Sequence, residues 1–161
     1  MTRYRVGNGF DAHRLVAGRP LVLGGVTVPF DRGLEGHSDG DCVLHALCDA
    51  LLGAAGEGDM GRHFPSADAR WKGAASLLFL DEVARILARG GWELENADVT
   101  VVAQAPPLAP HAEAMRAAIA RALAAPVESV SVKAKSTDGL GAFGRGEGVA
   151  AVATALLRRD G

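Results

Sequence analysis

The residues best suited to chemistry are two histidines and one aspartate that could bind a single metal ion. Asp11 and His13 are separated by one residue, so in an extended chain both side chains project from the same side and can offer one oxygen and one nitrogen. His45 could supply a third ligand from a helix, and Asp49, one helical turn later, could orient it. An alternative stays open, because a helical histidine flanked by leucines is often a hydrogen-bonded core residue.

A second group of polar residues surrounds a glycine-rich stretch. Its members are Lys133, Lys135, Ser136, Thr137, Asp138 and Arg145. Hydroxyl groups and cations bind phosphate, and a carboxylate among them can hold a divalent ion. A solvated turn has the same composition, so both interpretations stay open. Residues 139–144 also match GxGxxG, but the 17 residues that follow are too few for the rest of a dinucleotide site.

Nucleophilic catalysis by a side chain of this protein is not indicated. The sequence has neither a Walker A motif nor a GxSxG elbow. Cys42 and Cys48 are too far apart for a zinc-binding CxxC pair. Both lie in one expected helix, which favours two small buried side chains.

Composition and charge limit the class of protein. The 161 residues are 48% apolar and 22% charged, which predicts one globular domain over residues 1–161. The 17 basic and 19 acidic residues give a net charge of −2, so no basic field would attract nucleic acid or an anionic membrane. No apolar run reaches the roughly 18 residues of a membrane span, and no signal peptide is recognisable, so a cytoplasmic location is expected.

Three elements are expected to position the first group of residues. Residues 3–10 alternate as a strand does, and Gly24–Gly25 predicts a tight hairpin. Ser38, followed three positions later by Asp41, predicts an N-cap and an acidic first turn. The helix that follows should end near Ala55.

The middle of the chain alternates between helices and less regular segments. Residues 56–72 have no apolar period, which predicts a long loop that could act as a lid. Residues 74–89 predict an amphipathic helix, and the β-branched run 98–103 predicts a strand buried on both faces. A third helix should start at about His111 and end before Pro126.

The last third predicts the rest of a sheet. Residues 130–135 read as a strand and 136–147 as a glycine-rich loop. The apolar run 148–157 could be helix or strand, and a strand is favoured because the sheet needs a partner there. The expected fold class is therefore α+β, a single domain with a mixed β-sheet and helices on one face.

Short blocks of sequence, spread over the whole chain, carry a family resemblance. They are Gly9–His13, Leu23–Val26, His37–Asp41 with Leu44–Leu47, Gly58–Gly61 with Phe64–Pro65, Val99–Thr100 with Ala103–Pro106, Val132–Ala134 and Gly144–Gly148. In order and separation these blocks resemble the 2-C-methyl-D-erythritol 2,4-cyclodiphosphate synthase family.

The resemblance implies an enzyme of the non-mevalonate isoprenoid pathway. Its substrate would be a cytidine diphosphate-linked small molecule, 4-diphosphocytidyl-2-C-methyl-D-erythritol 2-phosphate. The 2-phosphate would attack the β-phosphate and release CMP, so the substrate itself would supply the nucleophile. The resemblance also implies one Zn²⁺ per subunit, Mg²⁺ or Mn²⁺ on the substrate diphosphate, and a homotrimer. The three sheets would pack around a threefold axis, with active sites at the subunit interfaces.

The resemblance also implies roles for individual residues. The zinc ligands would be Asp11, His13 and His45, the groups that stabilise the transition state His37 and Ser136, and the magnesium ligand Asp138. The substrate would contact Asp11, His13, His37, Ser38, Asp59, Met60, Gly61, Phe64, Pro65, Ser66, Ala67, Asp68, Ala103, Gln104, Ala105, Pro106, Pro107, Leu108, Ala109, Lys135, Ser136, Thr137, Asp138, Ala142 and Arg145. Of these, 59–68 would hold the erythritol unit, 103–109 the cytosine, and 135–138 the ribose and diphosphate.

The chain departs from the family pattern at three of these positions. Ser136 replaces the usual threonine and keeps the hydroxyl group, whereas Asp138 replaces a common glutamate and is one methylene shorter. Ala142 occupies a position where phenylalanine is common at the threefold axis, with Phe143 beside it.

Two other classes of function remain open from the sequence. A zinc-dependent nucleotide hydrolase would use the same three ligands with water in the fourth position. A non-catalytic trimeric module that binds an isoprenoid or a nucleotide would need no open position.

Overall fold

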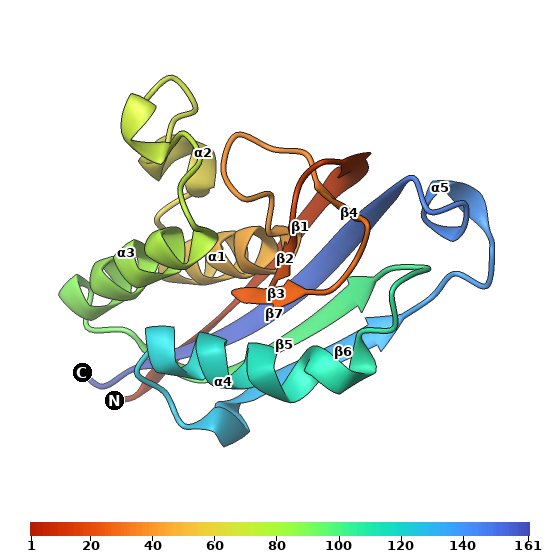
Figure 1. Ribbon diagram of the computed structural model, residues 1–161. Coiled ribbons are helices and arrows are strands. Elements are labelled where there is room, and N and C mark those ends of the chain that lie inside the picture. The colour runs from red at the N-terminus through yellow and green to blue at the C-terminus, as the bar shows by residue number, and fades with distance from the viewer.

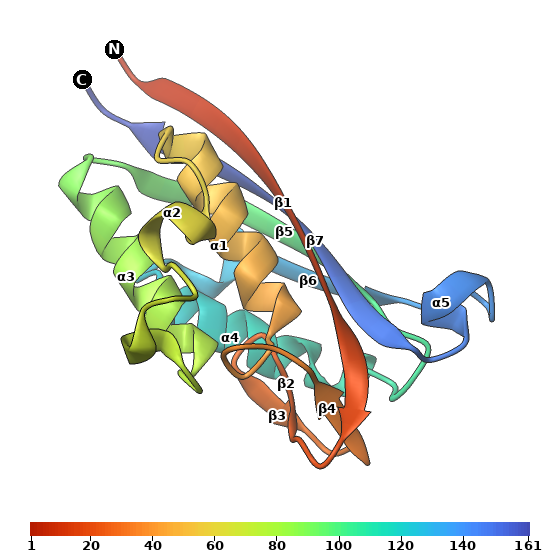
Figure 2. The ribbon, with the colours of Figure 1, turned by 90° about the horizontal axis from the view of Figure 1, so that it is seen from above.

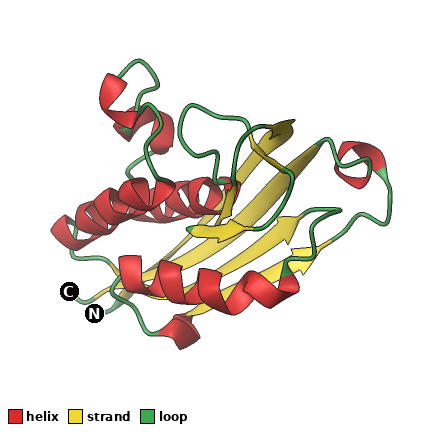
Figure 3. Cartoon of the chain, in the orientation of Figure 1, coloured by secondary structure: helices red, strands yellow, loops and turns green.

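A five-stranded mixed sheet forms the centre of the computed structural model, which describes residues 1–161 (Figures 1 and 3). In spatial order the strands are β4 (Arg32–Leu34), β1 (Arg3–Ala17), β7 (Gly148–Arg159), β5 (Glu93–Val102) and β6 (Val130–Lys135). All neighbours are antiparallel except β5 and β6, which are parallel. A separate two-stranded hairpin consists of β2 (Leu21–Leu23) and β3 (Val26–Val28).

Three long helices cover one face of this sheet, as the view from above shows (Figure 2). They are α1 (Cys42–Ala55), α3 (Ser76–Arg89) and α4 (Ala112–Ala122). Short helices are α2 (Met60–His63) and α5 (Gly141–Gly144), and single 3₁₀ turns span Ala69–Trp71, Ala109–His111 and Val127–Ser129. The predicted α+β domain with helices on one face is confirmed. None of its helices has the length and apolar character of a membrane span.

The opposite face of the sheet lies open in the single chain. Large apolar side chains on β1 and β7 are exposed there: Tyr4 by 58%, Val6 by 68%, Phe10 by 61% and Val152 by 40%. Side chains alternate along a strand, so the neighbours of these residues point into the helix layer. Large exposed apolar side chains grouped on one face are typical of a protein–protein contact.

Several helices and strands expected from the sequence are confirmed, although some begin or end at other residues than predicted. The run 148–157 is a strand, β7, and it lies in the middle of the sheet, where it pairs with both β1 and β5. The predicted strand 3–10 continues to Ala17, so the first two metal-ligand candidates lie within it. The two cysteines are buried and unpaired, as expected.

Three expectations about local structure are wrong. The strand predicted over 98–103 is not buried on both faces, since Val99 and Val101 are buried but Thr100 is only half-buried. The long loop 56–72 contains α2 and a 3₁₀ turn, and the glycine-rich loop 136–147 contains α5. Asp59 and Asp68 cap the two turns in the first segment through their side chains, which a count of apolar residues does not detect, whereas α5 has no side-chain cap.

Candidate metal centre and substrate site

The three expected metal ligands meet between β1 and α1. Asp11 Oδ2 lies 2.8 Å from His13 Nε2 and 3.0 Å from His45 Nδ1, and the two histidine nitrogens are 3.3 Å apart. Donor atoms at about 2.0–2.1 Å from one tetrahedral zinc ion would lie roughly 3.3 Å from each other. The group therefore has the size and the donor types that a metal ion requires.

Charge also suits this group to a cation. Burial by itself would raise the pKa of Asp11, but the hydrogen bond with His13 holds that pKa well below 3.8. The hydrogen bond with Asp11 in turn raises the pKa of His13 above 6.5. Asp11 is thus ionised at neutral pH and offers an anionic oxygen beside two imidazole nitrogens.

Two glycines of β1 allow α1 to approach closely enough for this group to form. A Cβ atom at Gly9 would lie 1.9 Å from Ala46 O, and one at Gly7 would lie 1.9 Å from Ala50 O. Any larger residue would push the helix away from the strand. Since side chains alternate along β1, its two metal-ligand candidates share the face of these glycines and point toward His45 on the helix.

Asp41 ties the start of α1 to the β2–β3 hairpin. Its buried carboxylate accepts hydrogen bonds from Gly24 N at 2.9 Å, Gly25 N at 2.7 Å and Leu44 N at 3.1 Å. Asp41 is therefore the N-cap of α1, and the prediction of Ser38 as the cap is wrong. The two carboxylate oxygens can accept from all three N–H groups of the hairpin and the helix, whereas a serine hydroxyl can accept from two at most.

The other nitrogen of His45 faces two hydroxyl groups. Nε2 lies 3.0 Å from Ser76 Oγ and 3.2 Å from Ser38 Oγ. Asp39 accepts hydrogen bonds from both the backbone nitrogen and the hydroxyl of Ser76. The orienting role expected of Asp49 is wrong, because that carboxylate accepts its hydrogen bond from the first residue of α2. Ser76 lies 31 positions after His45, and no local sequence pattern links the two.

His37 lies on an exposed loop held beside the metal-ligand group. Its backbone carbonyl accepts a hydrogen bond from Gly73 N at 2.8 Å. On either side, Arg19 donates to Gly36 O at 3.1 Å and to Ser38 O at 2.6 Å. These bonds fix the backbone and leave the His37 imidazole open to solvent. The sequence offered no signal for Arg19.

The segment expected to hold the erythritol unit lies next to the same group. Asp59 is the N-cap of α2, and Phe64 is buried against Trp71 and Phe79 at ring-centroid distances of 5.1 and 5.0 Å. Phe79 in turn lies 5.9 Å from the His45 ring. Of the other residues, Met60 and Asp68 are half-buried, and the exposed ones are Gly61, Pro65, Ser66 and Ala67.

The two segments expected to bind the cytidine diphosphate lie together. Gly139 N donates a hydrogen bond to Gln104 Oε1 at 3.2 Å, which joins 103–109 to the loop after β6. Within that loop Ser136 Oγ donates to Asp138 Oδ1 at 3.1 Å. Ala103 and Leu108 are buried, Pro106 and Thr137 are half-buried, and the exposed members are Gln104, Ala105, Pro107, Ala109, Lys135, Ser136 and Asp138.

One chain does not bring these segments to the metal-ligand group. The candidate ligands on β1 are three strand positions from β6, with β7 and β5 between them. At about 4.8 Å per strand the separation is roughly 14 Å. The single chain therefore carries two parts of the expected site that lie apart.

The last two expected contact residues lie in α5 and directly after it, shortly before the start of β7. Ala142, with Phe143, lines a hollow of about 210 Å³ that also touches His13. Arg145 is exposed, and its Nε lies 2.7 Å from Glu147 Oε1.

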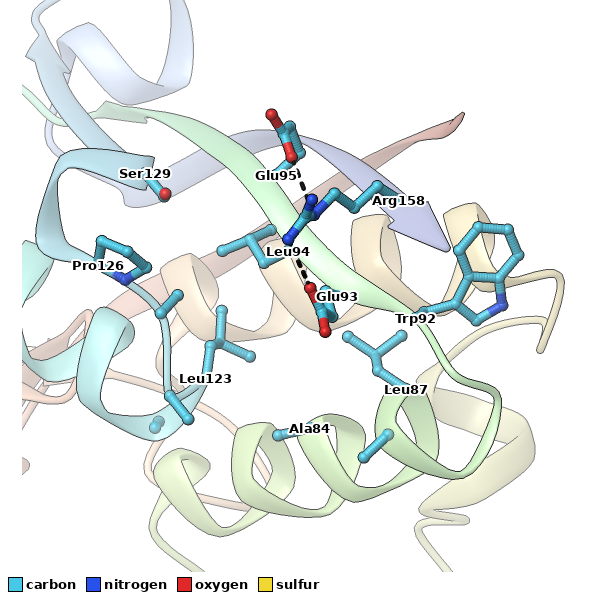
Figure 4. Close-up of a pocket in the computed structure, with 14 residues that line it drawn as sticks. Ala84, Leu87, Trp92, Glu93, Leu94, Glu95, Leu123, Pro126, Ser129 and Arg158 are labelled. Atoms are coloured by element: carbon cyan, nitrogen blue, oxygen red, sulfur yellow. Dashed lines mark hydrogen bonds and ion pairs between the residues drawn. The ribbon is translucent and has the colours of Figure 1, made fainter. Parts of the chain in front are cut away.

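A larger cavity of about 500 Å³ lies elsewhere, between the C-terminal ends of α3 and α4 and the start of β5 (Figure 4). Its lining is mostly apolar, with Leu94 and Leu123 among the lining residues. Its charged side chains already pair with one another, since Arg158 contacts Glu93 at 2.8 Å and Glu95 at 3.3 Å. None of the residues expected to bind substrate or metal belongs to this cavity.

Comparison with known proteins finds a family model and full-length relatives that match this chain. Residues 4–158 match the model of the YgbB family. A relative from Burkholderia thailandensis, 2-C-methyl-D-erythritol 2,4-cyclodiphosphate synthase, is 55% identical over 157 residues, which cover 98% of this chain and 97% of that protein.

Solved structures give the same result. The bifunctional IspDF of Campylobacter jejuni is 40% identical with a TM-score of 0.95, and the match covers 99% of this chain and 43% of that one. A structure of 2C-methyl-D-erythritol-2,4-cyclodiphosphate synthase in a CDP-bound form is 40% identical with a TM-score of 0.87, and the match covers 95% of this chain and 99% of that one.

Proposed function

The chain belongs to the YgbB family and has 2-C-methyl-D-erythritol 2,4-cyclodiphosphate synthase activity in the non-mevalonate isoprenoid pathway, and from this premise we propose how its residues carry the reaction. Asp11, His13 and His45 hold one Zn²⁺ per subunit. The observation that carries the proposal is the triangle of their donor atoms, with sides of 2.8, 3.0 and 3.3 Å. Bound there, the ion supplies Lewis-acid polarisation of a phosphate oxygen and a fixed point for orientation.

The reaction needs no nucleophile from the protein. An oxygen of the substrate's 2-phosphate forms a bond to the β-phosphorus, the bond from that phosphorus to the bridging oxygen breaks, and CMP leaves with the bridging oxygen. No water is consumed. The protein's task is to hold the two phosphates in line and to neutralise charge that moves to the leaving oxygen.

Other side chains bind and orient the substrate. Two groups stabilise the transition state: the imidazole of His37, which is exposed beside the metal-ligand group, and the hydroxyl of Ser136. Asp138, next to Ser136, holds Mg²⁺ or Mn²⁺ on the diphosphate. Residues 59–68 bind the erythritol unit and 103–109 the cytosine. A structure of a relative in a CDP-bound form supports a cytidine diphosphate as part of the ligand.

A homotrimer with shared sites reconciles this chemistry with the single chain. The metal-ligand group and the 135–138 segment are about 14 Å apart in one chain, so a site that uses both is completed by a second copy. The open face of the sheet, with Val6 and Phe10 exposed, supplies the apolar surface for such packing.

An isotope experiment tests the cyclising chemistry. The enzyme is incubated with the cytidyl substrate, Zn²⁺ and Mg²⁺ in ¹⁸O-enriched water, and both products are weighed by mass spectrometry. Attack by the 2-phosphate predicts a cyclic diphosphate and CMP without label. Label in CMP, or a linear labelled diphosphate with no cyclic product, would mean hydrolysis and would refute the proposal.

Complementation tests the shared site. His45→Ala removes a proposed zinc ligand and Ser136→Ala removes a group from the other half, so each variant alone should be inactive or slow. Hybrids prepared by co-expression should regain activity, because some interfaces combine an intact His45 from one copy with an intact Ser136 from the next. Hybrids that stay as slow as the parents, or a chain that sediments as a monomer, would contradict a shared site.

A further inference from the structure

We propose that Ser76, anchored by Asp39, is a positioning residue that fixes the ring and the tautomer of His45 so that Nδ1 is free to bind metal. The inference rests on the proposed metal site and adds to it the groups behind the ligand. Ser76 and Asp39 come from two different segments, the first residue of α3 and the loop before α1. Neither residue touches the metal face of His45.

The available protons determine the direction of these hydrogen bonds. The carboxylate of Asp39 can only accept, and it accepts from the hydroxyl of Ser76. A serine hydroxyl has one proton, so Ser76 Oγ must then accept from His45 Nε2, which lies 3.0 Å away. Nε2 therefore carries a proton. In the neutral imidazole Nδ1 is then unprotonated, with its lone pair directed toward Asp11 Oδ2 at 3.0 Å.

The chain Asp39–Ser76–His45 is rigid. Ser76 is fully buried, and its backbone nitrogen donates to the second oxygen of Asp39 at 2.9 Å. Asp39 is itself held, because its Oδ1 accepts from Asp41 N at 3.1 Å. A hydroxyl fixed at two points leaves the imidazole one favourable orientation.

Ser38 does not replace this function. Its hydroxyl lies 3.2 Å from the same nitrogen but has no carboxylate behind it, and it also accepts from Gly40 N at 3.3 Å. The direction of the hydrogen bond between Ser38 and His45 is therefore not fixed, because the Ser38 hydroxyl can either donate or accept. Only Ser76 has a partner that forces it to accept from His45.

The substitution Ser76→Ala separates positioning from folding. It removes the hydroxyl but keeps the backbone nitrogen that donates to Asp39, so the start of α3 keeps its hydrogen bond. We expect the affinity for Zn²⁺, measured by competition with a chromophoric chelator, to fall about 10–100-fold. The matched control, Ser38→Ala, should lose less affinity.

A spectroscopic signal tests the tautomer directly. In the zinc-loaded protein labelled with ¹⁵N-histidine, the Nε2 proton of His45 should be observable and exchange slowly with water. In zinc-loaded Ser76→Ala the same proton should exchange faster, whereas a purely structural role of Ser76 would leave its exchange unchanged. If Ser76→Ala does not fold, Asp39→Asn preserves the volume but turns an NH₂ group toward one of the two Ser76 groups that donate to Asp39. It should loosen Ser76 and change both measurements in the same direction.

The outcomes separate this inference from the proposal on which it rests. Wild-type protein that binds no Zn²⁺, or His45→Ala that retains it, would overturn the metal site and the inference together. A wild type that binds Zn²⁺ through His45, with the folded variant equal to it in affinity and in Nε2 proton exchange, would overturn the positioning role alone.

Discussion

Replacing Gly9 by alanine should disable the metal site without touching a ligand. The new Cβ atom would lie 1.9 Å from Ala46 O and 2.9 Å from Ala50 N, both backbone atoms of α1. An ordinary contact for such an atom begins at 3.4 Å. Backbone cannot rotate away as a side chain can, so the helix and the strand must separate.

The size of the effect follows from that overlap. The Cβ atom of an alanine at position 9 needs about 1.5 Å more room, the difference between 3.4 and 1.9 Å. Because His45 is the residue before Ala46, a shift of the helix at Ala46 also moves His45. Metal–ligand distances tolerate only about 0.2 Å, so the third ligand should be lost and the affinity for Zn²⁺ should fall at least about 100-fold. Overpacking of this kind also destabilises the fold by roughly 1–3 kcal/mol.

Chelator competition measures the affinity, and thermal unfolding of the metal-free protein measures the stability. Gly53→Ala is a useful companion, because Gly53 is an exposed residue of α1 with no atom within 4 Å of its would-be Cβ. It should stabilise the protein by about 0.5–1 kcal/mol. Combined with Gly9→Ala, it should recover stability but not Zn²⁺ binding.

Gly7→Ala provides the comparison along the same helix. Its Cβ would overlap Ala50 O by the same amount, at 1.9 Å, but farther from His45. It should destabilise the fold to a similar degree and weaken Zn²⁺ binding less. The reasoning is refuted if Gly9→Ala binds Zn²⁺ as tightly as the wild type does.

Three further predictions follow from the site. Asp41→Ala leaves three backbone N–H groups without their acceptor, and chemical denaturation should show a loss of at least about 2 kcal/mol. Because the hydrogen bond with Asp11 raises the pKa of His13 above 6.5, protons and Zn²⁺ compete for its nitrogen. Titration should show the apparent affinity for Zn²⁺ falling as the pH drops below that pKa, by up to about tenfold per pH unit, while the metal-free protein should lose stability as the pH rises through it. Asp138→Asn should raise the Mg²⁺ concentration needed for turnover. Asparagine tolerates the φ of 51° at this position, so the variant should keep the local backbone. An unchanged Mg²⁺ dependence would therefore place the ion elsewhere.

The sequence by itself determined the elements and the candidate ligands, because both depend on local spacing. Alternation along a strand predicted that Asp11 and His13 share a face, and the capping pattern of Ser38 and Asp41 predicted the helix that carries His45. Strand 130–135 was predicted with its observed bounds. These features need only the conformation of neighbouring residues, which side-chain pattern controls.

Only the tertiary structure decided how distant segments meet. The approach of α1 to β1 depends on a contact between Gly9 and the helix backbone, and the groups behind His45 are Ser76 and Asp39 rather than the nearby Asp49. The separation of the proposed metal ligands from 135–138 follows from the order of the strands. Contacts of this kind are set by packing between elements far apart in the chain, and no local pattern of residues encodes which elements will be neighbours.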